Sequence, residues 1–154
     1  MKIISGGQTG ADRAGLDAAA ALGLEYGGAV PRGRRTEDGR LSSKYSGMRE
    51  TNSAGYRQRT FENIRDADAT LLFYRGNISG GTRLTEQLTG WIRRPCLLID
   101  LKNISEAAAA ERIRRWLKKT RPKILNIAGS RESGSPGIYK KTYRILLSSL
   151  NHPG

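Results

Sequence analysis

The chain has 154 residues and a formal net charge of +13 at pH 7, and at about 100–200 residues per domain it has room for one domain only. Apolar residues make up 37% of the chain, enough for one core, but no apolar stretch approaches the ~18 residues of a membrane-spanning helix. So large a positive net charge favours an anionic partner, such as nucleic acid, an acidic surface or a phosphorylated small molecule. The single cysteine, Cys96, cannot form an internal disulfide, which indicates a cytoplasmic protein.

Five short apolar runs alternate with helical patterns and predict a parallel sheet that is covered on both faces. The predicted strands are Lys2–Ser5, Glu25–Val30, Ala69–Tyr74, Cys96–Leu101 and Lys123–Ala128. Thr9, with Asp12 three residues later, predicts the cap of a first helix that ends before Gly23. The other predicted helices run from Ser53 to Asp66, from just after Gly81 to just before Pro95, from a cap at Ser105 to Lys119, and from Ser135 to Leu150.

This alternation predicts an α/β fold, a three-layer Rossmann-like sandwich on a five-stranded parallel sheet of order 2-1-3-4-5. We expect one Rossmann-like domain over residues 1–150 and a frayed tail over residues 151–154, which contains the only histidine, His152. Residues 31–52 form the one long irregular stretch. A loop of that length is usually functional or disordered.

Two glycine-rich turns each follow a predicted strand and lead directly into a predicted helix. They are Ser5–Asp12 and Arg75–Thr82. Glycines let backbone N–H groups approach an anion without obstruction by Cβ, and a helix N-terminus adds the positive end of its dipole. In the order 2-1-3-4-5 both turns flank one crevice at the switch point of the sheet, where ligands bind. The sequence therefore predicts an anion-binding crevice between the two turns.

Arginines and other polar side chains are expected near the same crevice. Arg32 follows the second strand, Arg49 closes the long loop, and Tyr56, Arg59 and Asn63 share one helix face at i, i+3 and i+7. A guanidinium group suits phosphate or carboxylate, although a solvated loop or an ordinary surface face would show the same residues. Asn126–Glu132 forms a third polar loop on this rim. The candidate ligand-binding residues are Gly6, Gly7, Gln8, Thr9, Gly10, Asp12, Arg32, Gly33, Arg49, Glu50, Tyr56, Arg59, Asn63, Ser79, Gly80, Gly81 and Thr82.

These motifs, in this order over residues 2–150, resemble the molybdenum cofactor carrier family. The matching segments are Ser5–Asp12, Pro31–Arg35, Arg49–Thr51, Tyr56–Asn63, Asp66–Thr70, Ser79–Thr82 and Asn126–Glu132. The resemblance implies a Rossmann-like fold, binding of molybdenum cofactor (a phosphorylated pterin with a metal oxyanion) and often a homotetramer. The wider superfamily also holds the cytokinin-activating phosphoribohydrolases and DNA-processing protein A.

The hydrolases of that superfamily use a P-G-G-x-G-T-x-x-E loop, to which Ser79–Glu86 corresponds imperfectly. The second G-T step is missing and Glu86 lies one residue too close, which argues against hydrolysis but not against anion binding.

Three hypotheses follow, in this order. The first is a carrier that binds a phosphorylated pterin or a nucleotide-like ligand between the two Gly-Gly turns, with no protein-ligated metal and as a homo-oligomer of two or four chains. The second is a phosphoribohydrolase that acts on a nucleoside monophosphate through Glu50, Glu86 or Asp12. The third is a DNA-binding protein that uses residues 105–154, whose net charge is +8.

Overall fold

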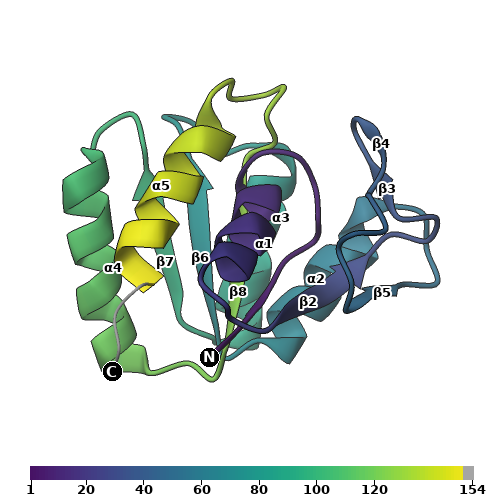
Figure 1. The fold of residues 1–154 in the computed structure, drawn as a ribbon, viewed down its shortest axis with the longest axis horizontal. Coiled ribbons are helices and arrows are strands. Elements are labelled where there is room, and N and C mark those ends of the chain that lie inside the picture. The colour runs from purple at the N-terminus through teal and green to yellow at the C-terminus, as the bar shows by residue number, and fades with distance from the viewer. Residues whose placement is uncertain (151–154) are drawn as a thin grey trace.

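The computed structural model describes residues 1–150, so the predicted tail with His152 lies outside the described residues. A six-stranded parallel sheet carries α1, α4 and α5 on one face and α2 and α3 on the other (Figure 1). The strands are β1 (Lys2–Ile4), β2 (Tyr26–Val30), β5 (Met48–Glu50), β6 (Ala69–Tyr74), β7 (Cys96–Asp100) and β8 (Ile124–Gly129), with β3 (Arg35–Thr36) and β4 (Gly39–Arg40) in a separate hairpin. The helices are α1 (Ala11–Ala21), α2 (Tyr56–Asp66), α3 (Gly80–Ile92), α4 (Glu106–Thr120) and α5 (Ile138–Leu150).

The predicted three-layer α/β fold is confirmed, and the five predicted strands agree closely with β1, β2, β6, β7 and β8. The predicted cap of α4 is also present, because the Ser105 hydroxyl accepts the N–H of Ala108 at 3.1 Å. The predicted Thr9 cap of α1 is wrong. The helix begins after Gly10, which takes a φ of +80° that glycine tolerates best, and the Thr9 hydroxyl bonds to Glu37 instead.

The strand count and the strand order differ from the prediction. The order is β5-β2-β1-β8-β6-β7, so the predicted five-stranded sheet of order 2-1-3-4-5 is wrong. The short strand β5 adds a sixth member beside β2, and β8, the last strand in the chain, lies in the centre between β1 and β6. If β8 is counted first, the strands run 4-3-2-1-5-6, which is a doubly wound sheet that grows outward from its first strand.

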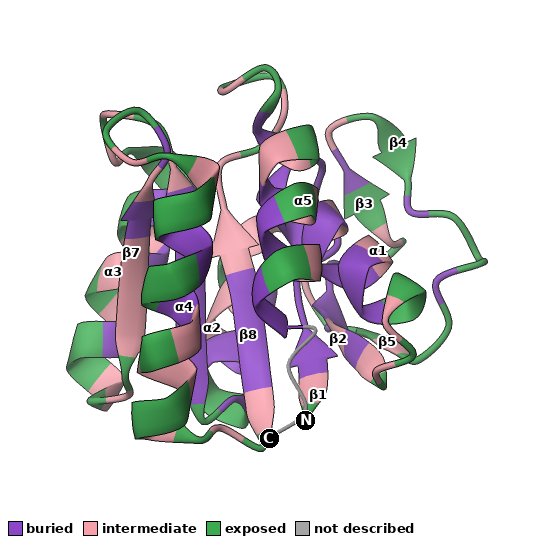
Figure 2. Cartoon of the chain, turned by 60° about the vertical axis from the view of Figure 1, so that its left-hand side comes forward, coloured by how far each residue is buried: buried purple, intermediate pink, exposed green. Residues whose placement is uncertain are grey.

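The hydrophobic core lies mainly between the sheet and helices α1, α4 and α5, whose inner sides are buried (Figure 2). The opposite face is more polar. Helix α3 buries three threonines, Thr82, Thr85 and Thr89, and the neighbouring strands bury Thr70 and Asn126, which bond to each other at 3.3 Å. The threonine hydroxyls at 85 and 89 donate to backbone carbonyls of α3 itself, which satisfies them without water. A polar layer of this kind favours a binding pocket over a dry core.

The long segment between β2 and β5 is ordered by its own contacts. Arg34 donates to the carbonyls of Leu41, Ser42 and Tyr45, and the side chains of Leu41 and Tyr45 pack against Leu16 of α1 in a second, smaller apolar cluster. The β3–β4 hairpin is thereby held beside the turn that follows β1. No helix within residues 1–150 is long and apolar enough to cross a bilayer.

Candidate ligand-binding site

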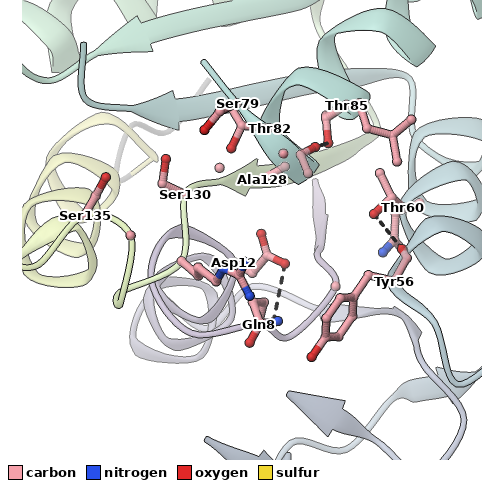
Figure 3. Close-up of a pocket in the computed structure, with 18 of the residues that line it drawn as sticks. Gln8, Asp12, Tyr56, Thr60, Ser79, Thr82, Thr85, Ala128, Ser130 and Ser135 are labelled. Carbon is pink, nitrogen blue, oxygen red and sulfur yellow. Dashed lines mark hydrogen bonds between the residues drawn. The ribbon is translucent and has the colours of Figure 1, made fainter. Parts of the chain in front are cut away.

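A pocket of about 620 Å³ lies at the carboxyl edge of the sheet and is bordered by α2 and α3 (Figure 3). Its size falls in the range of small-molecule sites. Six segments line it: the turn after β1, the start of α1, helix α2, the β6–α3 turn with the start of α3, the end of β8, and the β8–α5 loop. The predicted residues among its lining are Gly6, Gln8, Asp12, Tyr56, Arg59, Asn63, Ser79, Gly80, Gly81 and Thr82. The two Gly-Gly turns therefore border one pocket, and β8 lies between their strands.

A buried ion pair forms one wall of the pocket. Arg59 Nη1 lies 3.5 Å from Asp12 Oδ2, and both residues are less than 10% exposed. Burial raises the pKa of Asp12 to about 6, because loss of solvent outweighs the attraction of Arg59 and the N–H of Gln8. Burial likewise lowers the pKa of Arg59, against the attraction of Asp12. A carboxyl group that titrates near neutrality in a cleft is typical of functional sites.

Gly6 permits the approach of Arg59. The guanidinium donates to the Gly6 carbonyl at 2.7 Å, and a Cβ at residue 6 would collide with it. The same guanidinium lies 5.1 Å from the centre of the Tyr56 ring, and Arg35 lies 5.0 Å from that ring. The Asn63 side chain has a structural role, because its amide accepts the N–H of Ala29 in β2 and donates to the carbonyl of the same residue. These contacts fix α2 against the sheet and orient the wall of the pocket.

The N-terminus of α3 faces the pocket without any acidic partner. Its first turn contains no acid, and Ser79, the residue before the helix, makes no side-chain cap. Within residues 1–150, the N–H groups of Gly80 and Gly81 have no hydrogen-bond acceptor. Unpaired N–H groups and the helix dipole together make a binding site for an anion.

Two other helices that begin near the pocket, α1 and α5, have a carboxylate at their N-termini. Glu132 accepts the N–H groups of Gly137 at 2.6 Å and Tyr139 at 3.0 Å at the start of α5. Helix α1 carries Asp12 in its first turn. Helix α2, which begins at the pocket residue Tyr56, has no acid in its first turn either, so α2 and α3 differ from α1 and α5 in presenting a first turn without a carboxylate.

Several predicted residues lie outside the pocket. Gly7 faces Leu41, since a Cβ there would lie 2.8 Å from Leu41 Cδ2, so a Gly7→Val variant would test packing and not binding. Gly10 packs against the backbone of Ser130. The remaining predicted residues that do not line the pocket are Thr9, Arg32, Gly33, Arg49, Glu50 and Glu86.

The two arginines of this set, and Glu50, have other surroundings. Arg49 pairs with Glu62 at 2.6 Å and Asp66 at 3.3 Å. Glu50 accepts the N–H of Gly33 at 2.6 Å, and Arg32 is exposed. None of the three contributes to the pocket lining.

The pocket also has lining residues that the sequence-based list omits. The additional members are Thr60, Arg75, Asn77, Leu84, Thr85, Asn126, Ala128, Gly129, Ser130, Arg131, Gly134 and Ser135. Arg75 and Asn77 belong to the second glycine-rich turn, and Asn126–Arg131 to the third polar loop, so both signals are present in the sequence. Thr60 and Thr85 carry no such signal, because their role depends on how α2 and α3 lie against the sheet. Within residues 1–150, no three His, Cys, Asp or Glu side chains gather as a metal site would require.

The fold and the pocket define the class of this protein: a doubly wound α/β protein with a pocket at the carboxyl edge of its parallel sheet, the position at which such folds bind ligands. Residues 3–150 match the family model of the circularly permutated YpsA SLOG family. The chain belongs to this family, and a permuted chain agrees with the central position of β8.

One solved structure is closely similar to the chain. It is the crystal structure of a protein from Syntrophus aciditrophicus SB named "Putative molybdenum carrier protein", with 44% sequence identity and a TM-score of 0.94. The match covers 97% of this chain and 94% of that one. The resemblance to the molybdenum cofactor carrier family is thereby confirmed. No curated protein matches the chain.

Proposed function

We propose that this protein is a carrier that binds a phosphorylated pterin or a nucleotide-like anion in the pocket, with molybdenum cofactor as its cargo. The observation that carries the proposal is the N-terminus of α3, which offers unpaired N–H groups and no acid to the pocket. The phosphate of the cargo would accept hydrogen bonds from the N–H groups of Gly80 and Gly81 and from the hydroxyls of Ser79 and Thr82. The name of the similar crystal structure supports molybdenum as part of the cargo.

The rest of the pocket suits a polar heterocycle. Asp12, Gln8 and Asn126 line it with acceptors and donors, which would pair with the ring nitrogens and amino group of a pterin. Arg59, Arg75 and Arg131 line it as well. These three would neutralise the negative charge of the ligand, a role for which the sequence suggested Arg32, Arg49 and Arg59. The metal of the cargo would be held by the pterin's sulfur atoms, so no protein ligand to it is needed.

The experiment is a titration with inorganic phosphate, followed by calorimetry. Gly81→Asp places a carboxylate at the start of α3, where it stabilises the helix and competes with an anion. Nothing lies within 4 Å of a Cβ at this position, so the variant is expected to fold. We expect the wild type to bind one phosphate and Gly81→Asp to bind none, while the matched control Gly81→Ala binds as the wild type does. Equal binding by all three proteins would contradict the proposal.

The identity of the cargo needs a second measurement. Native mass spectrometry of the protein purified from its own host should reveal a co-purifying phosphorylated pterin. A co-purifying nucleotide would agree with the proposed anion site but would contradict the proposed cargo.

The hydrolase alternative has a separate test. Glu50 and Glu86 lie outside the pocket, whereas the Asp12 carboxyl lines it, so Asp12 is the acid or base that hydrolysis would require. We expect no release of free base from nucleoside monophosphates. Steady release that Asp12→Asn abolishes would replace the carrier with a phosphoribohydrolase.

We also propose that the carrier is a cytoplasmic homo-oligomer that associates through α3. While this helix buries threonines, its residue Leu88 is half-buried and Trp91 is 76% exposed. An exposed tryptophan next to a half-buried leucine on one helix would suit an interaction surface. Light scattering should therefore give a mass of at least two chains for the wild type and a lower mass for Trp91→Ser, and a monomeric wild type would refute the assembly.

A further inference from the structure

Glu37, at the tip of the β3–β4 hairpin, crosses to the loop between β8 and α5. Its carboxylate accepts hydrogen bonds from the hydroxyls of Thr9 and Ser133 and from the N–H of Ser133 at 3.2 Å. Arg131 Nε lies 3.9 Å away. Two hydroxyls, one backbone N–H and one guanidinium thus converge on a single carboxylate of the chain itself.

This donor set is suited to an oxyanion. Charge-assisted hydrogen bonds from hydroxyl, amide and guanidinium groups are those that bind phosphate. Burial alone would raise the pKa of Glu37, but the hydrogen bonds from Ser133 and Thr9, with the charge of Arg131, outweigh it and hold that pKa below its ordinary value. The surroundings of Glu37 therefore stabilise negative charge.

The donors belong to the two loops that form adjoining walls of the pocket. Arg131 lines the pocket, as does Gln8, the residue before Thr9. The side-chain amide oxygen of Gln8 (Oε1) accepts the N–H of Glu37 at 2.8 Å, and the Thr9 hydroxyl accepts the N–H of Glu132 at 3.1 Å. An anionic group at the Glu37 position would therefore lie next to the pocket.

The hairpin does not depend on Glu37 alone. Asp38 pairs with Arg13 of α1 at 2.9 Å and accepts the Thr36 hydroxyl at 2.6 Å. The carboxylate of Glu37 can leave its donors while this second ion pair still holds the hairpin to α1.

We propose that Thr9, Arg131 and Ser133 form a second oxyanion subsite beside the pocket, which the Glu37 carboxylate occupies until a ligand with two oxyanion groups displaces it. This inference rests on the proposed function, because the first oxyanion would lie at the N-terminus of α3. The preferred ligand class is therefore a small molecule that carries two phosphate-type groups.

The test is the number of inorganic phosphate ions bound per chain, measured by calorimetry for wild type, Glu37→Ala and Asp38→Ala. Both variants lose one negative charge from the same hairpin, but only Glu37→Ala vacates the subsite. We expect one phosphate for the wild type and for Asp38→Ala, and two for Glu37→Ala. Adding Ser133→Ala to Glu37→Ala should remove the second phosphate.

The outcomes separate the two proposals. One phosphate for Glu37→Ala, with none for the wild type, would refute the anion site at α3 and support the second subsite. The same stoichiometry for wild type and Glu37→Ala would refute the second subsite. If circular dichroism shows that Glu37→Ala is unfolded, Glu37→Gln replaces it, since glutamine retains an acceptor for Thr9 and Ser133 but not the competing charge.

Discussion

Asp12→Asn should make the protein more stable at pH 8, although it removes one partner of a buried ion pair. Breaking such a pair usually costs about 3–5 kcal/mol, because the remaining charge is left without compensation. Here the pKa of Asp12 decides whether the substitution raises or lowers the free energy of unfolding. It rises from 3.8 to about 6, which means that the fold disfavours the carboxylate even with Arg59 beside it.

The size of the effect follows from linkage. A pKa unit corresponds to about 1.4 kcal/mol, so the rise from 3.8 to about 6 corresponds to about 3 kcal/mol. The folded-state pKa is raised, so the contribution of Asp12 to the stability of the fold is fully present below pH 3.8. That contribution is lost as the pH rises through about 6. Asparagine resembles the protonated acid and has no such dependence.

Arg59 keeps other partners when Asp12 becomes asparagine. Its guanidinium still donates to the Gly6 carbonyl at 2.7 Å and lies over the Tyr56 ring. We therefore expect Asp12→Asn to exceed the wild type in free energy of unfolding by about 3 kcal/mol at pH 8 and to equal it below pH 4.

Urea denaturation of both proteins at pH 4, 6 and 8 measures this difference. Carboxylates with lowered pKa values, such as Asp38 and Glu62, act equally in both proteins and cancel. If Asp12→Asn is the less stable protein at pH 8, Arg59 attracts the carboxylate more strongly than burial disfavours it, and the reasoning is refuted.

Three further variants test the fold and the surface charge. Gly90→Ala should stabilise α3 by about 0.5–1 kcal/mol, since a Cβ there meets nothing within 4 Å, and an unchanged melting temperature would contradict this. Ser105→Ala should cost about 1 kcal/mol in urea denaturation by removing the cap of α4. Arg112→Glu with Arg115→Glu should weaken the retention of duplex DNA at low salt, measured by fluorescence anisotropy, and leave phosphate binding unchanged. Sub-micromolar DNA binding by the wild type at physiological salt would instead favour a DNA-binding protein.

The sequence predicts where the helices and strands lie along the chain better than it predicts which strands pair in the sheet. Apolar runs mark β6, which is buried, and β7, an edge strand that is mostly half-buried, because helices cover both faces of the sheet. Nothing in the run at β8 indicates that it enters between β1 and β6, since periodicity carries no information about strand pairing. Strand β5 was not predicted because its residues, Met48–Glu50, are mostly polar and form a short edge.

The same limit applies to the site. Glycine turns are predictable, because the chain conformation they require is local, and both turns border the pocket. The partners of long side chains are not local. Arg49 pairs with Glu62 and Asp66, which come close only when α2 packs beside β5, whereas Arg131 reaches the pocket from a loop that follows the last strand.

The central position of β8 has a consequence for how the protein is made. Until β8 leaves the ribosome, β1 and β6 have no neighbour on their inner sides, so the nascent chain holds two partial sheets with apolar, unpaired edges. Such edges can pair with other chains, and long-range parallel pairing forms slowly. We therefore expect this protein to depend on chaperones during synthesis more than a relative whose central strand comes first.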